Sequence, residues 1–218
     1  MKDRSPFTFG LIATLLALNT TTLPRANELP FELLKTPATQ GSMAPNLCSF
    51  GDHFALSWID RKSKGVASVR VAGWNGNAFG EASTLATSKQ MFANWADIPS
   101  VIEAPSGALY AHWLDRISGE TYAYGIRIVR STDRGKSWNS MGWLHNDTSP
   151  TEHGFVSFIP EGKRVRAFWL DGRAMAKEGG KMMLRTAILD GEKIKDERVL
   201  DDDIAAQVKQ IIFHFSWH

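Results

Sequence analysis

Cysteine is almost absent from this sequence of 218 residues, which contains only Cys48. With no second cysteine, an internal disulfide and a CxxC zinc or redox site are both excluded. The sequence predicts a small buried thiol within a strand at residues 45–50. The alternative is a partner cysteine in a part of the protein that this chain does not include.

Blocks of like charge are also missing. The 25 Lys and Arg residues are spread among 23 Asp and Glu, which gives a formal net charge of +2. A dedicated nucleic-acid binder usually carries a basic stripe, so nucleic acid is not expected as a partner. No phosphate-cradling Gly-rich loop and no metal-ligand spacing of His and carboxylates occurs, so neither a cofactor nor a metal is expected.

The uncharged run at residues 7–18 is too short to span a bilayer. It follows Lys2 and Arg4, which is typical of a signal peptide. We therefore expect a signal peptide over residues 1–26, a secreted or periplasmic location, and no membrane span after cleavage. The alternative is a buried N-terminal helix.

A repeat is the main positive feature of the chain. An apolar-Trp-apolar-Asp pattern occurs at Trp58, Trp113 and Trp169, at separations of 55 and 56 residues. In each period, turn residues divide the sequence into four short apolar segments. The expected strands are 46–50, 54–60, 66–71 and 79–85, then 98–104, 108–115, 124–131 and 138–145, then 155–159, 164–171, 182–189 and 194–200.

Four antiparallel strands in about 55 residues is the size of one β-propeller blade. The predicted fold is therefore an all-β propeller of four-stranded antiparallel blades. The expected organisation is an N-terminal segment at 27–44, blades at 45–93, 94–150 and 151–203, and a tail at 204–218 that does not match the repeat.

The turn between the third and fourth strands of the middle period carries a motif. Its sequence, STDRGKSW, resembles the Asp box (Ser-x-Asp-x-Gly-x-Ser/Thr-Trp) of sialidase-like propellers with BNR repeats, and the matching residues are Ser131, Asp133, Gly135, Ser137 and Trp138. The carboxylate of such a turn can accept hydrogen bonds from turn amides, and the glycine can adopt a positive φ. The resemblance implies a wheel of about six blades, of which this chain supplies about three. It predicts a truncated product, or an oligomer only if two half-propellers close into one wheel.

Topology selects the candidate functional face. The loop that enters the first strand of a blade and the loop between its second and third strands lie at the same end of the sheet, and the Asp-box turn lies at the other. On the candidate face, Asp97 and Asp115 are the predicted catalytic carboxylates. The predicted ligand contacts are Trp95, Arg61, Arg116, Glu152, His153 and Arg173, a set suited to a glycan or other small anionic ligand.

Several alternatives accompany this site. The Asp-Arg pairs recur in every period, which favours salt bridges between blades over catalysis. His112, Tyr122 and Tyr124 are expected to be buried packing residues. The sequence also lacks the early Arg-Ile-Pro motif of sialidases, since the nearest string is Asp97-Ile98-Pro99.

The predicted function is a fragment of an exported, sialidase-like exo-glycosidase that is inactive as this chain. A non-catalytic propeller module that binds carbohydrate or protein is the alternative, and a product without any activity is the third.

Overall fold

The computed structural model describes residues 33–50, 53–62 and 65–202. The expected signal peptide and the tail at 204–218 lie outside the described residues. The architecture described below belongs to the unit that begins at Lys35.

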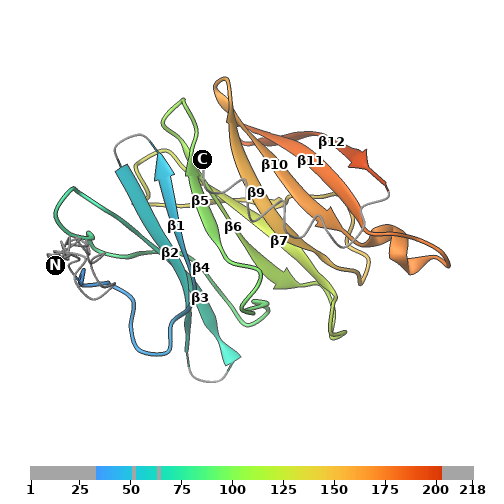
Figure 1. The fold of residues 1–218 in the computed structure, drawn as a ribbon, viewed down its shortest axis with the longest axis horizontal. Coiled ribbons are helices and arrows are strands. Elements are labelled where there is room, and N and C mark those ends of the chain that lie inside the picture. The colour runs from blue at the N-terminus through green and yellow to red at the C-terminus, as the bar shows by residue number, and fades with distance from the viewer. Residues whose placement is uncertain (1–32, 51–52, 63–64, 203–218) are drawn as a thin grey trace, which may run out of the picture. The chain divides into compact units, whose positions relative to one another are not determined.

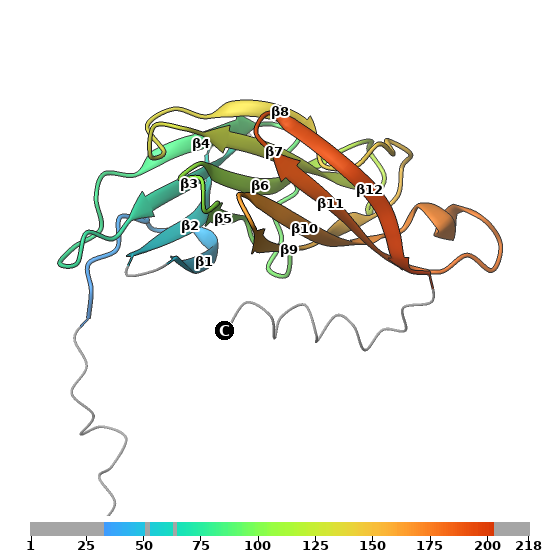
Figure 2. The ribbon, with the colours of Figure 1, turned by 90° about the horizontal axis from the view of Figure 1, so that it is seen from above.

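Three four-stranded sheets follow one another along the chain (Figure 1). Every neighbouring pair of strands within a sheet is antiparallel. The first blade contains β1 (Met43–Phe50), β2 (His53–Arg61), β3 (Ala67–Gly73) and β4 (Ser83–Ser88); the second contains β5 (Ser100–Glu103), β6 (Leu109–Arg116), β7 (Tyr124–Ser131) and β8 (Asn139–Trp143); and the third contains β9 (His153–Glu161), β10 (Arg164–Asp171), β11 (Met183–Asp190) and β12 (Lys193–Asp201). Figure 2 shows the three sheets from a second direction, with β12 at the edge of the third sheet.

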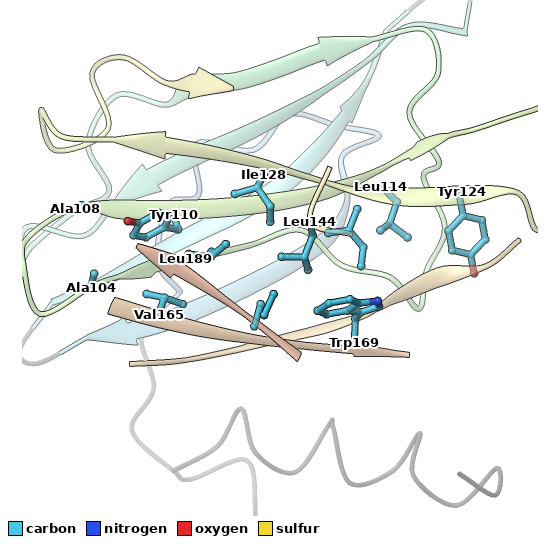
Figure 3. Close-up of a cluster of buried hydrophobic side chains, with 13 residues drawn as sticks. Ala104, Ala108, Tyr110, Leu114, Tyr124, Ile128, Leu144, Val165, Trp169 and Leu189 are labelled. Carbon is cyan, nitrogen blue, oxygen red and sulfur yellow. The ribbon is translucent and has the colours of Figure 1, made fainter. Parts of the chain in front are cut away.

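The sheets pack face to face through two clusters of buried apolar side chains. One cluster joins the first and second blades and includes Ile59, Val69, Ala111 and Val129. The other joins the second and third blades, where Tyr110, Leu114 and Ile128 lie against side chains that include Val165, Trp169 and Leu189 (Figure 3). Alternate residues of β6 enter the two clusters, because successive side chains of a strand point to opposite faces. This is the packing of neighbouring β-propeller blades.

One strand differs clearly from its predicted position. The fourth strand of the first blade was expected at 79–85, but β4 is Ser83–Ser88. Phe79 instead forms an isolated bridge with Trp74 and packs edge-on against the rings of Trp74 and Phe54. The aromatic residue therefore closes the preceding turn rather than starting the strand. In addition, the loop after β10 contains a short 3₁₀ helix, η3 (Arg173–Ala176).

The turn from 131 to 138 has the hydrogen bonds that its residue types predicted. Asp133 accepts from the amide of Ser137 at 2.9 Å, from its hydroxyl at 2.6 Å, and from the hydroxyl of Ser131 at 2.7 Å. Hydrogen bonds from Ser137 and Ser131 hold the pKa of Asp133 below its usual range. Gly135 has a φ of 80°, and Trp138 packs against the cluster between the first two blades. This turn is a structural element at the end of the sheet opposite the candidate face.

Cys48 lies on β1, within the strand where the sequence predicted it, and it is partly buried. Its Sγ atom lies 3.0 Å from the side-chain nitrogen of Asn46. Burial raises the pKa of the Cys48 thiol. Within the described residues, no helix has the length and apolar character needed to cross a membrane.

Candidate functional site

A hollow of about 420 Å³ lies where three segments of the second and third blades meet. The β6–β7 loop, the segment leading into β9 and the connection after β10 supply its lining residues, which are Glu120, Tyr122, Pro150, Thr151, Glu152, Gly172, Met175 and Ala176. These segments belong to the two kinds of loop that define the candidate face. Of the predicted site residues, only Glu152 lines this hollow.

The carboxylate of Glu152 is fixed by a buried tyrosine. Tyr124, at the start of β7, donates its hydroxyl proton to Glu152 Oε1 at 2.7 Å. The ring of Tyr124 is 2% exposed and stacks on Phe92, with ring centroids 4.0 Å apart. Burial, together with the charges of Asp97 and Glu152, raises the pKa of Tyr124 above its usual value. Tyr124 therefore remains a neutral phenol that orients Glu152 as a hydrogen-bond acceptor.

Arg116 stands next to this pair. Its guanidinium lies 4.9 Å from the centroid of the Phe92 ring, which is the ring that stacks on Tyr124. A cation over an aromatic face is a favourable contact, and it fixes the direction of the Arg116 side chain. Arg116, Phe92, Tyr124 and Glu152 thus form a continuous series of contacts leading to the hollow.

Asp97 fastens the second blade to the third. Its Oδ1 atom accepts from the amide of Phe155 at 2.9 Å, and its Oδ2 atom accepts from the side chain of Asn94 at 2.8 Å. The side chain is buried, with 7% of Asp97 exposed. A Cβ atom on Gly154 would lie 2.6 Å from Asp97 Oδ1 and 3.2 Å from Tyr124 Cε2, so the close approach requires glycine. These contacts assign Asp97 a positioning role between the blades, and its catalytic role stays a prediction.

Asp115 belongs to a unit that all three blades repeat. The indole N–H of each repeated tryptophan donates to the aspartate two residues later: Trp58 to Asp60 at 2.7 Å, Trp113 to Asp115 at 3.1 Å, and Trp169 to Asp171 at 2.9 Å. An arginine lies opposite each tryptophan on the next strand and approaches the same carboxylate: Arg70 at 4.0 Å, Arg127 at 3.3 Å and Arg185 at 3.9 Å. The carboxylates are therefore held within their own blades, which indicates a structural role for Asp115.

Among the described residues, Arg61 and Arg116 form no salt bridge between blades, although their recurrence suggested one. Arg61 donates to the carbonyl of Ala93 at 3.3 Å, and Arg116 lies over Phe92. Of the three arginines, Arg173 is the one that pairs with the preceding aspartate within the described part of the chain, at 2.7 Å from Asp171 Oδ1. Arg173 also donates to Asn146 and Glu197, both at 2.8 Å, so each nitrogen of its guanidinium is already engaged.

His153 lies inside the protein rather than at the rim of the site. Its side chain has no exposed surface, and its ring nitrogens are 3.1 Å from Asp147 Oδ2 and 3.1 Å from Asp171 Oδ2. The ring stacks on His145 with centroids 4.0 Å apart. Burial lowers the pKa of His145 to about 3, and the nearby His153 is the second cause of this decrease. His145 accepts from the amide of Ile126 at 3.1 Å, which fits a neutral ring.

For the remaining aromatic residues and His112, the structure agrees with some of the predictions and contradicts one. Trp95, a predicted ligand contact, is 87% exposed. Tyr124 is a packing residue, as expected, but Tyr122 is 67% exposed, so the prediction that it packs inside is wrong. His112 is buried as expected, although neither ring nitrogen has a hydrogen-bond partner among the described residues.

Sequence reasoning did not select Glu120, Tyr122 or Met175, which line the hollow. The available signal was the position of Glu120 and Tyr122 in or beside the loop between the second and third strands. Across the part of the chain that the structure describes, no three His, Cys, Asp or Glu side chains form a group that could hold a metal ion.

Comparison with protein-family models and with curated proteins finds no match. Among solved structures, the fold is similar to the GH93 α-L-arabinofuranosidase of Fusarium graminearum in complex with arabinobiose, with a TM-score of 0.51, 14% identity, and coverage of 76% of this chain and 49% of that chain. It is also similar to the α-L-arabinofuranosidase from Lactobacillus brevis, with a TM-score of 0.50, 12% identity, and coverage of 80% of this chain and 61% of that chain.

The chain therefore spans between about half and three-fifths of the length of these two enzymes. At such low identities the likeness establishes the fold alone. That fold is a series of β-propeller blades of the kind found in glycoside hydrolases.

Proposed function

We propose that the chain is part of an exported, glycan-acting propeller of the sialidase-like kind. In this proposal, the hollow beside Glu152 holds a sugar, and the chain by itself binds that sugar without hydrolysing it. The protein is secreted or periplasmic, and residues 1–26 serve as its signal peptide. The Asp-box motif at residues 131–138 and the glycosidase-type fold support this assignment.

The hydrogen bond from Tyr124 to Glu152 is the observation that carries the proposal. An oriented carboxylate in an open hollow can accept hydrogen bonds from sugar hydroxyls. The exposed ring of Tyr122 lines the same hollow and offers an aromatic face to the apolar side of a sugar ring. Carboxylate and aromatic groups together form a small polar and apolar recognition site.

The state of the predicted acids supports the absence of turnover. Glycoside hydrolysis requires two carboxyl groups on either side of the scissile bond. Both oxygens of Asp97 already accept hydrogen bonds that hold the loop, and Asp115 is bound by Trp113 and Arg127. Neither of these two carboxyl groups is therefore available to the hollow without breaking these contacts. Of the two carboxylates that line the hollow, Glu152 is already held by Tyr124, and Glu120 is exposed.

The same observation favours a second candidate, which is a non-catalytic module that binds carbohydrate. The two candidates differ in what a complete wheel would do, because in a hydrolase the remaining blades would complete the catalytic site. For this chain they predict the same behaviour: binding without turnover.

Binding and hydrolysis can be measured separately on the purified chain. We expect saturation-transfer NMR to detect arabinobiose, and Glu152→Gln to weaken the signal while Glu81→Gln, an exposed change in the first blade, does not. Chromogenic α-L-arabinofuranoside and fluorogenic sialoside substrates should remain intact. Release of the chromophore or fluorophore that disappears in Glu152→Gln would refute the lack of turnover. An unchanged NMR signal in Glu152→Gln would refute the proposed site.

A further inference from the structure

The charges around the hollow are all of one sign. Its lining contains the carboxylates of Glu120 and Glu152, and none of the described lining residues is Lys, Arg or His. Tyr124 donates to Glu152 as a neutral phenol, so it adds no charge of either sign. We propose that this hollow takes an uncharged sugar unit and rejects a carboxylated one such as a sialic acid. This inference rests on the proposed glycan-binding function and narrows its substrate class.

Binding a carboxylated sugar would require a cation with free donors. Arginine is the usual choice, because its guanidinium grips a carboxylate through two parallel hydrogen bonds. Arg173 lies directly after Gly172 of the lining, but four of its five N–H groups already donate to Asp171, Asn146 and Glu197, which leaves no pair of donors for a bidentate contact. Breaking those bonds would leave Asp171, which has no exposed surface, without its closest cation.

Two other arginines of the candidate face are directed elsewhere. Arg116 lies over the ring of Phe92, and Arg61 donates to the carbonyl of Ala93. Neither residue lines the hollow. A carboxylated sugar would therefore meet Glu120 and Glu152 without a compensating positive charge, and like charges in a partly desolvated site repel one another.

An uncharged sugar fits the same groups. Its hydroxyls can donate to the carboxylates, and hydrogen bonds to an ionised acceptor are stronger than those between neutral groups. Its C–H face can lie against Tyr122, which is 67% exposed, or against Met175, which is 56% exposed. Glu152 needs no reorganisation to accept, because Tyr124 already holds it.

Matched ligands test the inference on the full chain. Isothermal titration would compare lactose and arabinobiose, which are uncharged, with 3′-sialyllactose, which adds one carboxylated sugar to lactose. We expect at least one uncharged sugar to bind at least tenfold more tightly than 3′-sialyllactose at low salt. We also expect this ratio to decrease as salt screens the carboxylates.

Two variants test whether the carboxylate of Glu120 causes the discrimination between uncharged and carboxylated sugars. Glu120→Gln removes an exposed charge without disturbing the Tyr124–Glu152 bond, and it should reduce the discrimination several-fold, whereas Glu81→Gln should not change it. Equal or tighter binding of 3′-sialyllactose, or unchanged discrimination in Glu120→Gln, would overturn the inference and leave the glycan site standing. Failure of all three sugars to bind would instead overturn the proposed function.

Discussion

The indole nitrogen of Trp169 donates a hydrogen bond of 2.9 Å to Asp171, two residues later on the same strand. Both side chains are fully buried. Burial opposes ionisation of Asp171, but the close contact with His153 and the hydrogen bonds from Arg173 and Trp169 outweigh it and hold the pKa of Asp171 below its usual range. The apolar-Trp-apolar-Asp repeat is therefore a hydrogen-bonding unit that anchors a charged network inside each blade.

Removing the carboxylate of Asp171 should strongly destabilise the fold. Asp171→Ala leaves the indole N–H of Trp169 without an acceptor and Arg173 without its closest anion. We expect a loss of roughly 3–5 kcal/mol in the free energy of unfolding, the usual cost of breaking a buried ion pair on one side. Urea denaturation measures it. Asp60→Ala is the matched control, since its arginine lies 4.0 Å away, and it should cost less.

This unit shows which part of the fold the sequence could predict. The tryptophan and aspartate lie two residues apart, so their repetition is visible along the chain, and it correctly predicted the strands that carry them. The arginines Arg70, Arg127 and Arg185 lie on the next strand, opposite the tryptophans. Their link to the aspartates depends on strand register, so the sequence pointed to the adjacent Arg61 and Arg116 instead.

The stability of the protein should fall in acid because of His112. Burial lowers the pKa of His112 to about 3, whereas an unfolded histidine titrates near 6.5. Between about pH 6.5 and 3, the unfolded chain therefore binds a proton that folded His112 refuses. The contribution of this histidine is complete above pH 6.5 and decreases by about 1.4 kcal/mol per pH unit as the pH falls.

A substitution taken from the repeat isolates this effect. Phe168 occupies the position of His112 in the third blade, so His112→Phe should be tolerated while removing the titration. Denaturation at several pH values should show a shallower loss of stability in this variant than in the parent. His145, whose pKa is also about 3, should supply part of the remaining slope. Identical slopes in the parent and the variant would contradict the assignment.

Gly154 should tolerate no side chain. An added Cβ would lie 2.6 Å from Asp97 Oδ1, so Gly154→Ala must displace the carboxylate that accepts from Phe155. We expect a loss of about 1–3 kcal/mol in stability, in the range for overpacking a well-packed site. Gly119→Ala is the control, because nothing lies within 4 Å of its added Cβ. Equal melting temperatures for the two variants would argue against the close approach of the two blades.

The candidate site was harder to predict than the fold, and the pair at its centre shows why. Glu152 was selected from its place before the third blade, but Tyr124 lies 28 residues earlier and was expected only to pack. Tyr124 does both: its ring stacks on Phe92, and its hydroxyl donates to Glu152. Residue type and spacing cannot reveal a hydrogen bond between two blades. Tyr122, only two residues away, was assigned to the interior although its ring is exposed.

Tyr124→Phe should separate glycan binding from stability. The substitution keeps the ring against Phe92 and deletes only the hydroxyl that holds Glu152. Without this hydroxyl, Glu152 must be ordered when the sugar binds, at a cost of about 0.5–1.5 kcal/mol, so we expect affinity for an uncharged disaccharide to fall roughly 2- to 10-fold. Calorimetric titration, paired with a thermal melt of the same sample, measures both effects.

Tyr110→Phe is the matched control for this variant. Tyr110 is as buried as Tyr124, and its hydroxyl also links the second blade to the third, through a 3.0 Å hydrogen bond to the carbonyl of Gly191. That bond ends at the turn between β11 and β12, away from the hollow. Tyr110→Phe should therefore lower the melting temperature and leave sugar affinity unchanged. If both variants lost affinity equally, sugar binding would depend on the general packing of the two blades, and the orienting role of Tyr124 would be refuted.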